Sequence, residues 1–257
     1  MADLDEASTL LAGSEPLRWL FTGDSITHGA AHTNGSRDYV QLFEERVRWE
    51  LGRTRDHVLR TAISGRTVPD LLDDAEWSLS QYRADVVSLM FGMNDANTAT
   101  PDLLGFADDL TRAVALARAA GARAVIVHTP NRIIATETAA RRANLASYAE
   151  VVRQVAVATD AVLVDHHAAW SRAEQAGAVE RWIGHGCHPN AEGHRVLYRE
   201  LAAALGIWDP ASPTGRGFIP AAELLPERRP GPPPGSSAGR PDDGVPHPIA
   251  ADVRGRI

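Results

Sequence analysis

The chain has 257 residues with a formal net charge of −7, and 44% of its residues are hydrophobic. This hydrophobic share excludes wholesale disorder, and no apolar run approaches the roughly 18–20 residues that a membrane helix needs. All 26 basic residues are arginine, which excludes chemistry that needs a lysine, such as Schiff-base formation or a Walker-type phosphate loop.

Charge and the N-terminal composition limit the expected partners and location. A net negative chain repels polyanions, so no nucleic-acid partner is expected. The first 16 residues start acidic and lack a basic region followed by an apolar one, so no secretory signal is visible. One cysteine, Cys187, excludes a disulfide framework within the chain. We expect a cytoplasmic protein with no membrane span and a small-molecule substrate, and its oligomeric state stays open.

Five short apolar runs predict buried strands, because they are aliphatic or β-branched and are followed by Gly, Asn, Pro or Asp. They cover residues 17–21, 58–63, 86–91, 124–128 and 161–164. Amphipathic stretches predict helices over residues 39–51, 68–77, 101–120, 138–159 and 191–205. This alternation favours a three-layer α/β/α sandwich with a mainly parallel five-stranded sheet. Ligands of such sheets bind at the carboxyl ends of the strands.

Composition divides the chain into three parts. Residues 209–257 hold 11 of the 16 prolines and 7 of the 21 glycines, which favours extended or turn structure over a packed core. We therefore predict an N-terminal extension over residues 1–15, one folded domain over 16–208 and a Pro/Gly-rich tail over 209–257.

Polar residues at two strand ends and one helix entry suggest a reaction centre. A serine on a tight strand-to-helix turn, such as Ser25, can present a nucleophilic hydroxyl, although such serines more often cap helices. After the third strand, Asn94 could donate its amide to an oxyanion, and Asp95 could hydrogen-bond neighbouring backbone. Pro189 holds His188 extended before the last helix, where His188 could act as a general base.

Together these motifs resemble the SGNH hydrolase superfamily, also called GDSL esterases and lipases. The matching segments are GDSIT at 23–27, ISG at 63–65, GMND at 92–95 and HPNAEGH at 188–194, and the resemblance covers about residues 16–205. It implies a flavodoxin-like SGNH fold with Ser25 as nucleophile and His188 as base. It also implies an oxyanion hole made by the backbone N–H groups of Ser25 and Gly65 and the amide of Asn94. We expect Asp24 and Asp95 to give structural support.

One position departs from the family pattern, which usually has an aspartate three residues before the catalytic histidine. Here that residue is His185, whose neutral ring supplies no negative charge to stabilise an imidazolium. Three explanations stay open: the main-chain carbonyl of His185 orients His188, a carboxylate from elsewhere such as Asp165 does so, or the enzyme is slow. We favour a Ser25–His188 dyad with carbonyl support.

The preferred interpretation is a serine ester hydrolase that needs no metal or cofactor and works through an acyl-enzyme. We expect a short acyl group, such as acetyl, on a sugar or small metabolite. An acyltransferase and a lysophospholipase- or thioesterase-like enzyme are alternatives on the same site. A non-catalytic binding protein is disfavoured, because four separated residues suit one mechanism.

Several other residues are candidates for roles at the site. His28, Arg132 and Trp182 could contact the substrate. His166 and His167 are expected to be solvated loop residues or to line the mouth of the pocket. The H-x-C-H spacing at residues 185–188 does not match the usual zinc-ligand patterns, so no metal site is predicted.

Overall fold

The computed structural model of the chain describes residues 2–29, 32–174 and 177–216. Its central sheet has five parallel strands in the order β2–β1–β3–β4–β5. The strands are β1 (Arg18–Gly23), β2 (His57–Arg60), β3 (Val86–Met90), β4 (Ala124–His128) and β5 (Val162–Val164). All five predicted strands are present, with ends that differ by up to three residues.

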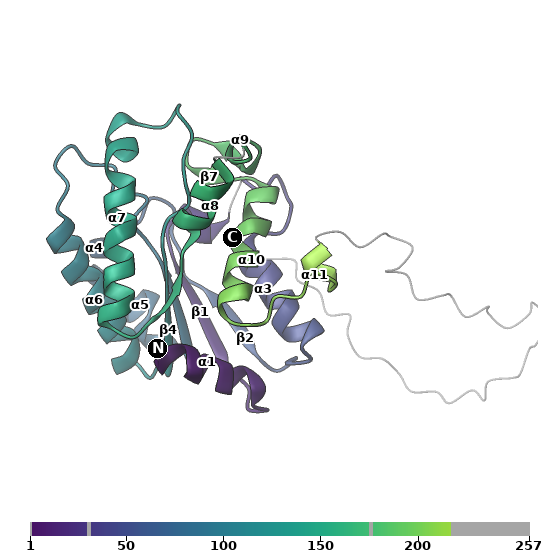
Figure 1. Cartoon of the computed structure of the whole chain (residues 1–257). Coiled ribbons are helices and arrows are strands. Elements are labelled where there is room, and N and C mark those ends of the chain that lie inside the picture. The colour runs from purple at the N-terminus through teal and green to yellow at the C-terminus, as the bar shows by residue number, and fades with distance from the viewer. Residues whose placement is uncertain (1, 30–31, 175–176, 217–257) are drawn as a thin grey trace, which may run out of the picture. The chain divides into compact units, whose positions relative to one another are not determined.

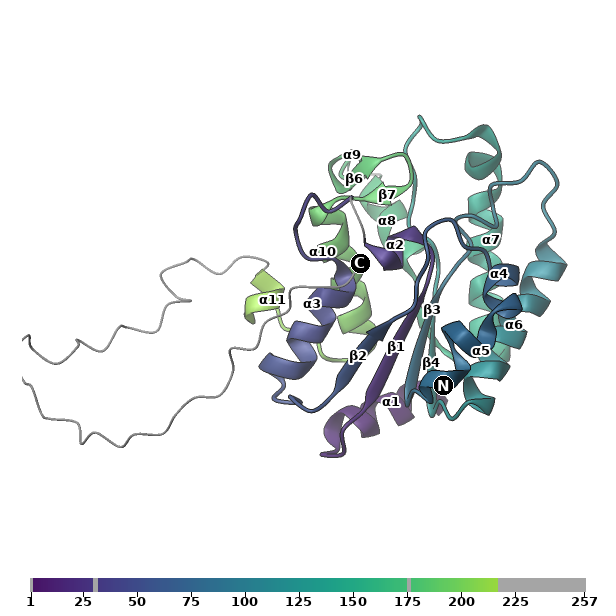
Figure 2. The same ribbon diagram turned by 180° about the vertical axis from the view of Figure 1, so that it is seen from behind.

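Helices cover both faces of this sheet, which gives the predicted three-layer α/β/α sandwich (Figure 1, Figure 2). One layer contains α4 (Val68–Asp73), α6 (Leu103–Ala119) and α7 (Ala139–Ala158). The other contains α3 (Tyr39–Glu45), α8 (His166–Glu174) and α10 (Ala191–Ala204). The inner strands β1, β3 and β4 are buried almost throughout, as expected for a parallel sheet covered on both faces.

Shorter elements complete the described part of the fold. The helical ones are α2 (Ser25–His28), α5 (Ala75–Ser78), the 3₁₀ turn η2 (Ser80–Tyr82), α9 (Val179–Trp182) and α11 (Pro213–Arg216). A separate antiparallel pair joins β6 (Ile183–His185) to β7 (His188–Pro189). This pair was not predicted, because two strands of two and three residues give no periodic pattern.

The N-terminal segment is part of the domain rather than an extension. Residues Ala2–Ala12 form α1, whose Ala7 and Leu10 are buried in the core. Asp3 is 6% exposed, and its carboxylate accepts hydrogen bonds from the Val125 backbone N–H at 2.9 Å and from Arg118 at 2.9 Å. Because Val125 is near the start of β4, α1 packs at the amino ends of the strands, away from the edge where ligands are expected.

The predicted helix over residues 39–51 changes type before it ends. Asp38 caps α3 in a capping box with Gln41, and the last turn is the π-helix η1 (Arg46–Glu50). π-helical turns are rare and are frequently found at functional sites. Here the turn presents Arg46 and Glu50 to the segment that follows α10.

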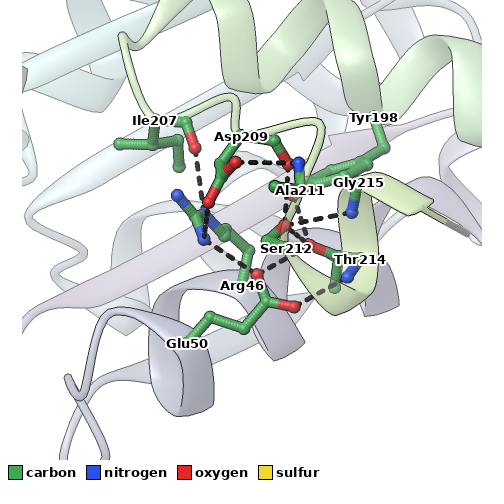
Figure 3. Close-up of polar contacts among 9 residues, drawn as sticks. All are labelled: Arg46, Glu50, Tyr198, Ile207, Asp209, Ala211, Ser212, Thr214 and Gly215. Atoms are coloured by element: carbon green, nitrogen blue, oxygen red, sulfur yellow. Dashed lines mark hydrogen bonds and ion pairs between the residues drawn. The ribbon is translucent and has the colours of Figure 1, made fainter. Parts of the chain in front are cut away.

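The folded domain also extends beyond the boundary predicted at residue 208. Arg46 donates to the Ile207 carbonyl at 2.9 Å and pairs with Glu50 at 3.0 Å, while Glu50 accepts from the Thr214 backbone N–H at 2.7 Å and hydroxyl at 2.9 Å (Figure 3). The Thr214 hydroxyl also meets the Tyr198 hydroxyl at 2.8 Å. Residues 209–216 are therefore fixed to the domain, and the rest of the predicted tail lies outside the described residues.

Candidate active site

Strand β1 places Ser25 at the carboxyl edge of the sheet through a tight turn. A Cβ atom on Gly23 would lie 2.5 Å from the Met90 carbonyl oxygen, so only glycine fits between β1 and β3. Asp24 then caps α2 by accepting a hydrogen bond from the Ile26 N–H at 2.9 Å. Ser25 is the first residue of this short helix and is 8% exposed.

His188 contacts Ser25 from a different element of the fold. It is the first residue of β7, and its Nε2 atom lies 2.8 Å from the Ser25 hydroxyl oxygen. This distance allows the ring to accept the hydroxyl proton directly. The structure thus brings together two residues that are 163 positions apart in the sequence.

The surroundings of His188 favour its neutral form. Burial and the neighbouring His32 ring lower the pKa of His188 to about 4, against a hydrogen bond to the His185 backbone that raises it. Because Nε2 faces Ser25, this backbone bond uses Nδ1, as the interpretation with carbonyl support expects. The His32 ring stacks on His188 at a centroid distance of 3.6 Å and an angle of 9°, and burial also lowers the pKa of His32.

The structure excludes one of the open explanations for the orientation of His188, and it corrects the expectation that His166 and His167 are solvated. Asp165 does not support His188: its carboxylate pairs with Arg153 at 2.7 Å and caps α8 at Ala168. His166 and His167 are not solvated loop residues, because they form the buried first turn of α8. A short apolar strand followed by Asp-His-His gave no sign that the next turn would be helical and covered.

The residues expected to hold the oxyanion lie on the loops after β2 and β3, the two strands on either side of β1. Gly65 is exposed with a φ of 86°, a conformation that favours glycine, and a Cβ there would meet open space. The Asn94 amide donates to the Arg66 carbonyl at 3.1 Å, and its oxygen faces Arg141 at 3.4 Å. An amide nitrogen carries two hydrogens, so one remains for a ligand.

Two carboxylates support these loops from within the protein. Asp95 accepts hydrogen bonds from the backbone N–H groups of Val68 and Gly92, both at 2.9 Å, and so joins α4 to the end of β3. Burial raises the pKa of Asp24 to about 7, with a further rise from Asp95 against the bond from Ile26. Both positions have the contacts of structural groups rather than of a proton donor aimed at Ser25.

The three suggested substrate contacts have different surroundings. His28 is exposed, and its Nδ1 atom meets the Ser64 hydroxyl at 3.0 Å. Arg132 pairs with Glu174 at 2.6 Å, and Trp182 is half-buried with its ring edge-on to Trp170 at 5.1 Å. Of the three, His28 is the one that stands exposed next to the Ser25 turn.

Three further residues, Arg141, Glu137 and His32, lie around the site. Arg141 of α7 is 8% exposed, donates to the Met93 carbonyl at 2.9 Å and pairs with Glu137 at 2.7 Å. Together with the stacked His32, these residues lie outside the four motifs. In the sequence, an arginine with an acidic residue four positions earlier looks like an ordinary ion pair on a helix surface. The sequence therefore does not show that this pair is buried beside the site.

A parallel α/β sandwich with a hydrogen-bonded serine and histidine at the carboxyl edge of its sheet defines a serine-type hydrolase. The chain belongs to the GDSL-like lipase/acylhydrolase family, whose model matches residues 21–196. It is thus an enzyme of the carboxylic ester hydrolase class, and its family acts on esters.

Relatives of known fold agree with this assignment. An acetylxylan esterase of Geobacillus stearothermophilus is 28% identical over 204 residues, which cover 73% of this chain and 93% of that protein. A catalytic mutant of Axe2, an acetylxylan esterase from the same organism, superposes with a TM-score of 0.65 at 25% identity over 74% of this chain and 94% of the other. Two Axe2 structures are of catalytic mutants in which an aspartate or a serine is replaced by alanine.

A GDSL-like lipase structure from Parabacteroides merdae has the same fold, with a TM-score of 0.65 at 17% identity over 75% of this chain and 97% of the other. None of the helices in residues 2–29, 32–174 and 177–216 has the length and apolar character needed to cross a bilayer. Within the same residues, no three His, Cys, Asp or Glu side chains group as metal ligands.

Proposed function

We propose that the protein is a serine esterase that removes a short acyl group, above all acetyl, from a carbohydrate or other small hydroxyl compound. Ser25 attacks the ester carbonyl while His188 takes its proton, and His188 then protonates the leaving alcohol. Water, activated by the same histidine, releases the acid from the acyl-enzyme.

The observation that carries this proposal is the 2.8 Å contact between the Ser25 hydroxyl and His188 Nε2. A serine hydroxyl is a weak nucleophile without an adjacent base, and this base is held in its neutral form. Negative charge on the carbonyl oxygen would be held by the Ser25 and Gly65 backbone N–H groups and the Asn94 amide. Donors of this kind contribute about 10²–10³-fold each in other hydrolases.

The choice of substrate rests on the relatives. Those of known structure that this chain resembles include an acetylxylan and acetyl-xylooligosaccharide esterase. The rim beside Ser25 is exposed at Ile63, Ser64 and Gly65, which suits a substrate that extends beyond a small acyl group. The Ser64 hydroxyl and the ring nitrogens of His28 can hydrogen-bond a sugar.

Hydrolysis of p-nitrophenyl esters from acetate to long chains, in the presence of EDTA, tests the chemistry. The Ser25→Ala variant should lose activity by several orders of magnitude while it remains folded. Ser147→Ala, an exposed serine on α7, is the matched control and should behave as wild type.

Acetylated xylo-oligosaccharides, assayed by acetate release, test the substrate class. A preference for acetyl esters together with acetate release supports the proposal. Turnover that persists in Ser25→Ala contradicts the nucleophile, and a maximum at long acyl chains contradicts the substrate class.

A further inference from the structure

The turn that carries His188 lies against a carboxylate from another part of the chain. Gly186 and Cys187 connect β6 to β7, and His188 follows directly. A Cβ atom on Gly186 would lie 2.7 Å from Oε2 of Glu137, so that carboxylate packs directly on the turn. Glu137 lies just before α7, and its side chain is only 9% exposed.

Glu137 is held in place as an anion. Its Oε1 atom accepts a hydrogen bond from the Thr138 N–H at 2.8 Å and pairs with Arg141 at 2.7 Å. Although burial opposes ionisation, these two contacts and the Cys187 thiol hold the pKa of Glu137 below its usual value. A buried carboxylate with a single arginine partner keeps acceptor capacity for a further donor.

Cys187 is the donor that Glu137 meets on the turn. Its side chain is 4% exposed and hydrogen-bonds the Glu137 carboxylate. Burial raises the pKa of this thiol to about 12, so the S–H group is present at neutral pH and can donate. The Cys187 carbonyl is fixed as well, by the Asn131 amide at 3.2 Å.

The same sulfur lies beside the catalytic ring. Cys187 Sγ is 3.8 Å from His188 Nδ1, the nitrogen on the side away from Ser25. A continuous path of contacts therefore runs from the Glu137 carboxylate through the thiol to the ring, on the side where the family usually places an aspartate. Sulfur is a weak acceptor, so the main effect of this path is on the position of the ring.

We propose that Glu137, acting through Cys187, is a positioning residue that works beside the His185 carbonyl and takes over part of the role of the aspartate that is absent at position 185. The carboxylate fixes the thiol and the 186–187 turn, and these keep the His188 ring oriented toward Ser25. This inference rests on the proposed serine esterase function.

The experiment compares kcat and KM for p-nitrophenyl acetate in Glu137→Gln and Cys187→Ala, with urea unfolding to check folding. Each should lower kcat at least about tenfold with little change in KM, a smaller loss than the roughly 10⁴-fold of a triad without its acid. Because both changes break the same path, the kcat of the double variant should be no lower than that of the less active single variant. Cys187→Ser keeps a donor and should retain most of the activity.

Two further variants separate positioning from a general structural effect. Glu44→Gln also removes a carboxylate paired with an arginine, Arg48, and should leave kcat unchanged. Adding His185→Asp to Glu137→Gln or Cys187→Ala should restore kcat, since it returns a carboxylate to the usual family position. Loss in Cys187→Ala is decisive because this variant leaves the Glu137–Arg141 pair intact.

The outcomes distinguish this inference from the proposed function. An inactive wild type contradicts the esterase proposal and with it this inference. An active wild type whose Glu137→Gln and Cys187→Ala variants stay within twofold of it contradicts only the inference. Losses that His185→Asp does not restore also contradict it, because they would come from general disruption of the turn.

Discussion

His188 has two imidazole neighbours on the same rim of the site. His32 stacks on its face, and the His185 ring lies at a centroid distance of 6.5 Å and an angle of 25°. A second positive charge at this distance would be costly in a partly buried site. The arrangement therefore keeps the base free to accept a proton over a wide pH range, but gives it a lower basicity than an aspartate partner would.

This electrostatic setting predicts an unusual pH dependence. A general base must be unprotonated, and His188 has a pKa lowered to about 4, so kcat/KM should fall only as the pH drops through that region. The wild type should lack the inflection near pH 6.5 that an ordinary histidine gives. Acetate release measured at mildly acidic to neutral pH checks this in the range where the protein stays folded.

The His185→Asp variant supplies the comparison. A carboxylate beside the ring favours the imidazolium, so the acidic limb of kcat/KM should move upward toward neutral pH. A wild-type inflection between pH 6 and 7 would show that the surroundings of His188 do not hold it neutral.

Elements that were absent from the sequence interpretation are those fixed by distant contacts. Helix α1 gives only a weak apolar pattern, and its place depends on Asp3 accepting from the backbone of β4, 122 residues away. The β6–β7 pair, which contains His188, is also too short to give a recognisable sequence pattern. The strands and the long helices α6, α7 and α10 were predictable because each has its own apolar face.

The π-helical turn η1 makes a testable contribution to stability. Glu50 is 10% exposed and receives both Arg46 and Thr214, so Glu50→Ala leaves buried donors without a partner. We expect a loss of about 1–3 kcal/mol in the free energy of unfolding. Urea unfolding followed by far-ultraviolet circular dichroism measures it.

Glu44→Ala is the matched control, since Glu44 also pairs with an arginine four residues away but is 35% exposed. It should cost no more than about 0.5 kcal/mol. Equal losses in the two variants would mean that residues 209–216 are not held by Glu50.

Over the whole molecule, buried histidines link stability to pH. Ser88, His128 and His166 form a buried chain with contacts of 2.8 and 3.0 Å. Burial lowers the pKa of His128 well below its usual value, that of His166 to about 3 and that of His194 to about 4. These pKa values lie below those of the unfolded chain, so the folded state binds fewer protons.

The sign of the effect follows directly. The free energy of unfolding should be highest above about pH 6.5 and should fall toward pH 4, by up to about 1.4 kcal/mol per pH unit for each such histidine. Urea unfolding at a series of pH values measures this slope. His166→Gln keeps a hydrogen-bonding group opposite His128 and should give a shallower slope; an unchanged slope would contradict the assignment.

At this scale the fold and the reacting pair were predictable, because motif order and strand ends define where the chain returns to one edge of the sheet. What supports the pair was not. Glu137 and His188 are brought together by the packing of α7 against the sheet, and Asp165, one of the alternatives that the sequence left open, pairs with Arg153 instead. Buried side-chain partners of this kind depend on tertiary packing, which local sequence patterns do not indicate.

The single cysteine of the chain also gives the site a built-in reporter. Cys187 is covered and its thiol stays protonated at neutral pH, so a thiol reagent can reach a reactive sulfur only when the β6–β7 turn opens. Its labelling rate therefore measures how often the segment that holds the catalytic base opens. Slower labelling with a ligand bound would show that the ligand reduces opening of this turn, and the measurement needs no chromophore on the substrate.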